Sequence, residues 1–167
     1  ANTFNNKEQT EPIEFAQTHG DTVYIHWLPY KDMMFASNKG SAFKTYNGKC
    51  TFKGKYRLSP NELRGSGTVD MIKADLVSSN ILFKQHQFFA DTSDFHIKAV
   101  EEAGLTFASN NVKATMDLDK RFGLFVTNGK GTIVQFPKNQ YVAYMERFKW
   151  FMDSEEIQLG DENVKLK

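Results

Sequence analysis

Alternating apolar and polar segments joined by Asn-Gly dipeptides constrain the fold of this chain more than any other feature. The segment AFKTYNGKCTFKGKYRL (42–58) has Asn47-Gly48 between two alternating stretches, and LFVTNGKGTIVQF (124–136) has Asn128-Gly129 in the same place. Asn-Gly favours the tight turns of β-hairpins, because both residues take positive φ angles at little cost. We therefore expect antiparallel hairpins at both places.

Two further segments extend the β pattern. DTVYIHW (21–27) alternates strictly, which predicts a strand with one apolar face. LSPNELRGSGTVDMI (58–72) contains a Ser-Pro-Asn-Glu turn followed by Gly65 and Gly67. This glycine pair predicts a bulge or a close approach of two backbones.

Two stretches fit both a strand and a helix. In TSDFHIKAVEEAG (92–104), apolar residues share one face in either conformation, and a Gly at the end could terminate a helix. In QFPKNQYVAYMERFKWFMD (135–153), the aromatic residues fit both periodicities in the same way. Periodicity alone leaves both interpretations open.

An internal similarity bears on this ambiguity. The stretch ILFKQHQFFADTSDFHIK (81–98) aligns with VQFPKNQYVAYMERFKWF (134–151), and the tetrapeptide FASN occurs twice, at 35–38 and 107–110. Identical residues of the long alignment are Phe83/Phe136, Gln87/Gln140, Ala90/Ala143 and Phe95/Phe148.

The alignment favours strands. The earlier copy contains DTSD at 91–94, which are poor helix formers. If the two copies share one conformation, extended structure suits both, so we favour strands at 92–103 and 141–152. We expect an all-β fold of stacked antiparallel units, solenoid- or open-jellyroll-like, with related units at about 55–98 and 107–151.

Length and composition fit one domain with a ring-rich core. The chain has 167 residues, of which 14% are aromatic, and fifteen are Phe. We expect a flexible polar lead-in at 1–20, a single all-β domain at 21–160 and a charged tail at 161–167. The sequence begins at Ala1 without a methionine or a signal segment, so we expect either a removed targeting segment or a piece of a longer chain.

Charge and cysteine usage exclude several classes of function. With 21 basic and 20 acidic residues interspersed, the chain lacks the basic stripe of a nucleic-acid binder or a polybasic membrane anchor. Cys50 is the single cysteine, so neither an internal disulfide nor a Cys-based zinc site is expected. No run of roughly 18 apolar residues occurs, so we do not expect a membrane-spanning helix.

No group of residues points to catalysis, a metal or another cofactor. The four histidines lie in separate segments without an i, i+4 pair. Asp117 and Asp119 fit the capping of a turn better than calcium binding. No nucleophile elbow, phosphate loop or dinucleotide fingerprint occurs. We therefore expect no catalytic residue and no metal site.

Aromatic residues are the remaining candidates for ligand binding. Tyr and Trp rings on a sheet face can stack on the apolar faces of sugar rings. The alternative interpretation is that the rings fill the core or pack against the neighbouring repeat. The candidate binding residues are Trp27, Tyr30, Tyr144, Trp150 and Phe151.

Several motifs resemble a known class of protein. LRGSG (63–67), ADTSDF (90–95) and FPKNQY (136–141) lie within a stretch, roughly 21–160, that resembles segments of large β-rich cell-envelope proteins of Bacteroidetes-type bacteria, whose function is uncharacterised. VKATMDLDKRFGLFVTNG (112–129) is more distantly similar to the periplasmic lipopolysaccharide-transport (organic-solvent-tolerance) family, which forms an open β-jellyroll groove. The resemblance implies a place in the periplasm, at the outer membrane or outside the cell, and it carries no catalytic residue.

These expectations combine into one functional hypothesis and two alternatives. We expect a non-catalytic structural or interaction module of a bacterial cell-envelope protein, bound to other segments of that protein or to a protein partner. The alternatives are a lipid or glycolipid carrier with a β-jellyroll groove, and a carbohydrate-binding module that uses surface aromatics. An open channel lined by Phe83, Phe88, Phe136 and Phe148 would favour the carrier, and a filled interior with open edges would favour the structural module.

Overall fold

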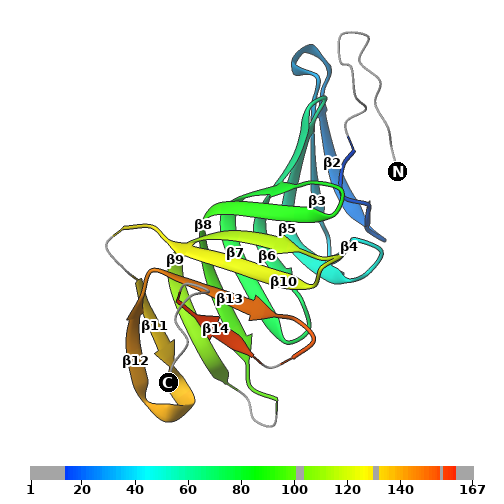
Figure 1. Cartoon of the computed structure of the whole chain (residues 1–167). Helices are drawn as coiled ribbons and strands as arrows, with labels where there is room; N and C mark the ends of the chain where they lie inside the picture. The colour runs from blue at the N-terminus through cyan, green and yellow to red at the C-terminus, as the bar shows by residue number, and fades with distance from the viewer. Residues whose placement is uncertain (1–13, 101–103, 130–131, 155, 161–167) are drawn as a thin grey trace.

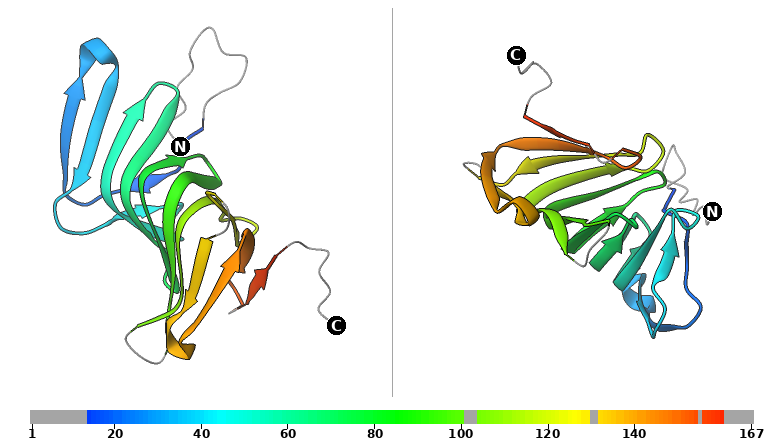
Figure 2. Two further views of the ribbon diagram at one scale, coloured as in Figure 1. Left: turned by 90° about the vertical axis from the view of Figure 1, so that its left-hand side faces the viewer. Right: turned by 90° about the horizontal axis from the view of Figure 1, so that it is seen from below.

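The computed structural model describes residues 14–100, 104–129, 132–154 and 156–160. These residues form one antiparallel sheet of fourteen strands and two short 3-10 helices (Figure 1). The predicted all-β class is confirmed, and the sheet is open and strongly curved (Figure 2). In chain order the elements are β1 (Thr18–His19), β2 (Val23–Leu28), η1 (Pro29–Lys31), β3 (Met33–Asn38), β4 (Phe43–Thr45), β5 (Cys50–Ser59), β6 (Glu62–Asp70), β7 (Ala74–Phe83), β8 (Gln87–Lys98), β9 (Leu105–Asp117), β10 (Phe122–Thr127), β11 (Thr132–Phe136), η2 (Pro137–Asn139), β12 (Tyr141–Met145), β13 (Arg147–Phe151) and β14 (Ile157–Leu159).

The centre of the sheet is the run from β5 to β9, in which each strand pairs with the next one along the chain. At β5 the sheet divides, because residues 50–52 pair with β4 and residues 55–58 pair with β3. At β9 it divides again, where residues 112–117 pair with β10 and residues 108–109 pair with β11. Two arms therefore leave each side of the centre, and they end in the edge strands β1, β2, β12 and β14.

The hairpin predicted at Asn47-Gly48 forms. It joins β4 to β5, with Thr45 and Cys50 as the last paired residues before the turn. Asn47 and Gly48 have positive φ angles of 57° and 81°, which is the backbone conformation that this dipeptide favours.

The hairpin predicted at Asn128-Gly129 does not form. β10 is already paired on both sides, with β9 and β13, so β11 pairs instead with the other half of β9, where Val134 faces Ser109. Asn128 helps to hold the segment that leads from β10 to β11, because its side-chain amide donates to the carbonyl oxygen of Asp91 at 2.6 Å. The prediction was wrong because the Asn-Gly signal says nothing of which strand the chain will pair with next.

Both ambiguous stretches are strands. The first belongs to the continuous strand β8, and the second forms β12 and β13, which are separated at Glu146. The strand interpretation is confirmed for residues 92–98 of the first stretch, whereas Ala99 and Val100 follow the end of β8 and residues 101–103 lie outside the described residues. At the aligned positions Phe95 and Phe148, both side chains are buried. The later copy differs because its strand is divided between two partners, β11 and β10.

The glycine pair in β6 behaves as predicted. The register between β6 and β7 shifts between Gly65 and Gly67, which marks a bulge. Gly67 has a φ of 152°, a conformation that side chains disfavour.

Aromatic rings fill the inner face of the curved sheet. Neighbouring rings lie 4.2–6.4 Å apart between centroids, at the distances of favourable aromatic pairs. Phe83, Phe88 and Phe148, three of the four residues named for an open channel, are at most 1% exposed, and Phe136 is half-buried. The interior at these residues is therefore packed. The rings form two clusters, Phe43, Tyr46, Phe52, Tyr56, Phe83 and Phe88 in one, and Phe95, Phe107, Phe125, Phe136, Phe148 and Trp150 in the other.

Two hairpins at opposite ends of the sheet share one turn that the sequence analysis did not predict (Figure 1). β2 and β3 are joined through η1, and β11 and β12 through η2, and each short helix begins with Pro. Each turn ends at a residue with a left-handed backbone, Asp32 at a φ of 46° and Gln140 at 52°. The N–H of that residue donates to the carbonyl of Pro29 or Pro137. Each hairpin presents an outer strand, β2 or β12, that is paired on one side only.

Candidate functional site

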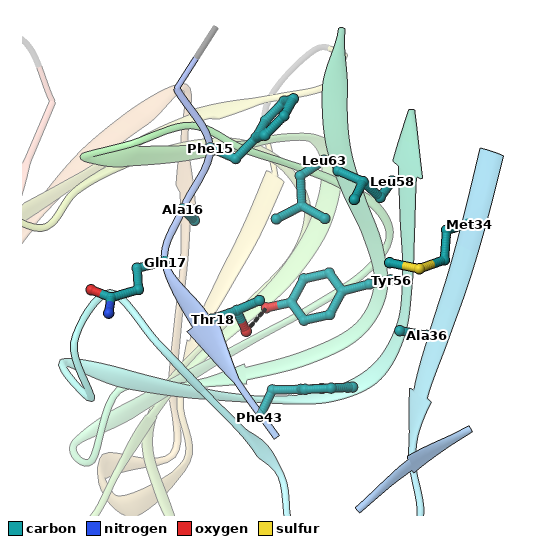
Figure 3. A pocket seen from close by; sticks show the side chains of 10 residues that line it. All are labelled: Phe15, Ala16, Gln17, Thr18, Met34, Ala36, Phe43, Tyr56, Leu58 and Leu63. Carbon is teal, nitrogen blue, oxygen red and sulfur yellow. Dashed lines mark hydrogen bonds between the residues drawn. The ribbon is translucent and has the colours of Figure 1, made fainter. Parts of the chain in front are cut away.

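An apolar pocket opens where the N-terminal segment crosses the inner face of β5 and β6 (Figure 3). Its volume is about 330 Å³, which is within the range of small-molecule sites. Residues 15–18 lie on one side of it, and β3, β5 and β6 form the other sides (Figure 3). The lining residues are Phe15, Ala16, Gln17, Thr18, Met34, Ala36, Phe43, Tyr56, Leu58 and Leu63.

Strand alternation explains why apolar side chains meet here. On β3, Met34 and Ala36 are two residues apart and share one face of the sheet. Their register partners on β5 are Leu58 and Tyr56. Because directly paired residues of neighbouring strands lie on the same face, all four side chains line the inner face together.

The phenol of Tyr56 is a polar group within the pocket. Its hydroxyl lies 2.9 Å from the Thr45 hydroxyl and accepts a longer hydrogen bond of 3.5 Å from Thr18. Burial raises the pKa of Tyr56 to about 12, although the hydrogen bonds with Thr18 and Thr45 oppose the shift. The hydroxyl is therefore neutral and already satisfied, which leaves the pocket suited to an apolar group.

The N-terminal wall of the pocket was missed by sequence reasoning. Residues 1–13 of the expected lead-in lie outside the described residues, but Ala16 is buried and Thr18 pairs with Thr45 on β4. Phe15 also forms an isolated bridge with Lys84. The sequence signal is weak, since Phe15 is one of two isolated aromatic residues in a polar stretch and shows no periodicity.

The edge strand β2 adjoins the pocket and carries exposed apolar residues. Trp27 pairs with Met34, which lines the pocket, and Trp27 is 53% exposed. Ile25 and Tyr24 are 60% and 58% exposed. The outer side of β2 has no strand partner within the described part of the chain. The apolar surface of the pocket thus continues to an unpaired edge.

Three of the five predicted binding residues are on the surface, but they are divided between two ends of the sheet. Trp27 is on β2 and Tyr30 is on η1, where it is fully exposed. Tyr144 is on β12, at the opposite end of the sheet, and is 77% exposed (Figure 1). Among the described residues, no ring contact joins these three side chains. They do not form a shared platform.

The other two predicted binding residues are not free surface rings. Trp150 is 2% exposed and packs against Phe95, with 5.4 Å between ring centroids, so it belongs to the core and offers no face for stacking. Phe151 is half-buried, and the ammonium group of Lys149 lies 5.1 Å from its ring centroid. Alternation explains the burial of Trp150, since it lies two residues after the buried Phe148 on β13.

The shifted pKa values describe structural groups. Burial raises the pKa of Cys50 to about 12, with the nearby Asp70 carboxylate adding to the shift. Burial alone would raise the pKa of Asp117, but hydrogen bonds from Lys120, Gln87 and Asp119 outweigh it and lower that pKa. Asp117 thus caps the turn after β9, as the sequence predicted. Within the described ranges, no group of three metal-ligating side chains comes together.

Comparisons with family models, with curated proteins and with solved structures gave no match for this chain. In the part of the chain that the structure describes, no helix has the length and apolar character needed to cross a bilayer.

Proposed function

We propose that this protein is a non-catalytic structural or interaction module of a bacterial cell-envelope protein, and that it binds neighbouring β-segments at the edge strand β2. The observation that carries this proposal is the composition of that edge, with Tyr24, Ile25 and Trp27 all more than half exposed. Native proteins commonly protect an edge with charges, bulges or Pro, whereas an open apolar edge is a template for another strand. The location in the envelope rests on the resemblance of the LRGSG and FPKNQY segments.

The filled interior supports a structural role. Buried rings fill the inner face, and the apolar pocket lies at one end of it. The pKa shifts agree with this role, since burial raises the pKa values of Tyr56 and Cys50, and hydrogen bonds lower those of Glu62 and Asp117. Each shift moves its group away from neutral pH, whereas acid–base catalysis favours a pKa near the working pH.

Sedimentation velocity over a wide range of protein concentration tests the proposal, because a second copy of the chain offers the same edges. We expect reversible association of the wild-type protein, and loss of that association in Ile25→Lys, which places a charge on the open edge. Leu124→Lys is the matched control, since Leu124 is 40% exposed but lies on β10, which is paired on both sides. A wild-type protein that stays monomeric at all concentrations would contradict the proposal.

A second candidate function, carriage of a lipid or glycolipid, is favoured by the apolar pocket. Met34, Leu58 and Leu63 offer apolar walls, and the one phenol among them is already hydrogen-bonded. Native mass spectrometry of protein purified without detergent tests this function. A retained lipid mass that disappears in Ala36→Trp, which narrows the pocket, would support carriage. A bare protein mass for the wild type would count against it.

A further inference from the structure

The outer face of the same strands carries a second, chemically different depression. One hollow of about 470 Å³ lies over β2, β3 and β5, and another of about 200 Å³ lies over β3, β5, β6 and β7. Phe35 and Lys55 line both hollows, so the two lie side by side, and together they are named here the outer groove. The apolar pocket is on the opposite face, because it is lined by the alternate residues Tyr56 and Leu58 of β5.

The smaller hollow of the outer groove is basic. Lys55, Arg57 and Arg64 line it, and Glu62 is the one carboxylate that pairs with them in the described part of the chain. Glu62 is shared, at 3.1 Å from Arg57 and 2.8 Å from Arg64. Three cations against one carboxylate leave an excess of positive charge, on a chain whose overall formal charge is only +1.

The cations are held in place before any ligand arrives. Arg57 and Arg64 are direct register partners across β5 and β6, an arrangement in which like charges repel. Arg64 also donates to the Asn80 side-chain oxygen at 3.0 Å. The ammonium group of Lys55 lies 4.7 Å from the ring centroid of Phe35, a cation–π contact. Such fixed donors lose little conformational entropy on binding.

The chemistry of this arrangement fits a phosphate. Guanidinium groups bind phosphate oxygens through pairs of N–H donors, and each Arg here keeps donors beyond those used by Glu62 and Asn80. A phosphate monoester carries close to two negative charges at neutral pH, which matches the excess of positive charge. Hydroxyl and amide groups of Ser66, Ser79 and Asn80 lie along the same groove and can bond to the rest of a polar ligand.

We propose that the outer groove binds a phosphate-bearing ligand, with the phosphate held by Arg57, Arg64 and Lys55. The three cations line the smaller hollow, over β3, β5, β6 and β7, whereas the edge strand pairing proposed above uses β2. The larger hollow adjoins that edge, since Tyr24 and Ile25 line it.

NMR titration of the full chain tests the proposal, with glycerol 3-phosphate as the soluble probe and arginine Nε–H signals as the readout. We expect saturable shifts at Arg57 and Arg64, and a loss of affinity of at least about tenfold in the double variant Arg57→Gln/Arg64→Gln. Arg121→Gln is the matched control. Arg121 has the same side-chain exposure as Arg57, 43%, but it pairs with a carboxylate of its own, that of Asp153.

A second arm distinguishes the source of the phosphate. Vesicles of phosphatidylcholine with and without phosphatidic acid are sedimented with the wild-type protein and the variants. Binding only to phosphatidic acid vesicles, lost in the double variant, would identify a lipid headgroup, whereas binding of glycerol 3-phosphate alone would identify a soluble ligand.

The remaining outcomes are equally decisive. If the double variant does not fold, Lys55→Gln takes its place, because Lys55 has no carboxylate partner among the described residues and its replacement breaks no ion pair. The affinity of this variant for glycerol 3-phosphate should fall several-fold. Linear, non-saturating shifts that are equal in wild type, Lys55→Gln and Arg121→Gln, together with vesicle binding that no variant changes, would overturn the proposal.

Discussion

Gly54 and Gly67 face each other across β5 and β6, with no room for a side chain on either. A Cβ on Gly54 would lie 2.2 Å from the carbonyl oxygen of Ser66, and a Cβ on Gly67 would lie 2.2 Å from that of Lys53. Because both obstacles are backbone atoms, no side-chain rotation relieves them. The pair therefore fixes the close approach of the two strands that separate the apolar pocket from the outer groove.

This crowding predicts a large loss of stability in Gly67→Ala. The control is Gly129→Ala, since Gly129 also has a positive φ, 124°, but has open space around it. Backbone strain alone should lower the free energy of unfolding by about 1–3 kcal/mol in the control. The clash should add at least ~2 kcal/mol in Gly67→Ala. Urea denaturation measures both, and equal losses would show that crowding has no effect.

Truncation of Phe148 should be far more damaging than truncation of Tyr144. Phe148 is 1% exposed and stacks on Phe125, with 4.6 Å between centroids and 10° between ring planes. Phe148→Ala should therefore lower the free energy of unfolding by about 3–5 kcal/mol. Tyr144→Ala removes an exposed ring and should change it by no more than about 0.5 kcal/mol. Similar effects of the two changes would place Phe148 outside the core.

The protein should lose stability as the pH rises above about 9. Burial raises the pKa of Cys50 from 9.0 to about 12 and that of Tyr56 from 10.0 to about 12. In the unfolded state these groups lose their protons first, so between these pH values the unfolded state binds fewer protons than the folded state. Stability is thus complete below pH 9 and declines toward pH 12. Cys50→Ala should show a shallower decline of the urea midpoint, and an unchanged slope would contradict the assignment.

At the acid end, Asp117 should contribute stability that is lost as the pH falls below its ordinary pKa of 3.8. Its carboxylate accepts from the Gln87 side chain at 2.8 Å and from the backbone N–H groups of Asp119 and Lys120. Asp117→Asn replaces one acceptor with a donor that faces Gln87, so it should cost about 1–3 kcal/mol at neutral pH. It should also flatten the acid dependence of the unfolding midpoint. Asp119→Asn is the exposed control and should cost less.

The strand class could be predicted from sequence because its signals are local. Alternation, the glycine pair at Gly65 and Gly67, and the turn at Asn47-Gly48 each depend on a few neighbouring residues, and each matches the structure. The strand interpretation of the ambiguous stretches also succeeded, since DTSD at 91–94 disfavours a helix in β8.

What could not be predicted depends on long-range pairing. The chain after Asn128-Gly129 pairs with β9 because both sides of β10 are occupied, and the second of those partners, β13, comes later in the sequence. The burial of Trp150 likewise depends on the curl of the sheet, which brings β13 over Phe95 on β8. The wall formed by residues 15–18 has only a weak local signal, the isolated aromatic residue Phe15.

Hydrogen–deuterium exchange at low and high protein concentration tests most directly whether β2 is the edge that meets a partner. We predict that peptides covering Val23–Leu28 gain protection as the concentration rises, because their outward N–H groups enter hydrogen bonds with another strand. In Ile25→Lys that gain should vanish. Exchange in β2 that is the same at both concentrations in the wild-type protein would contradict the account.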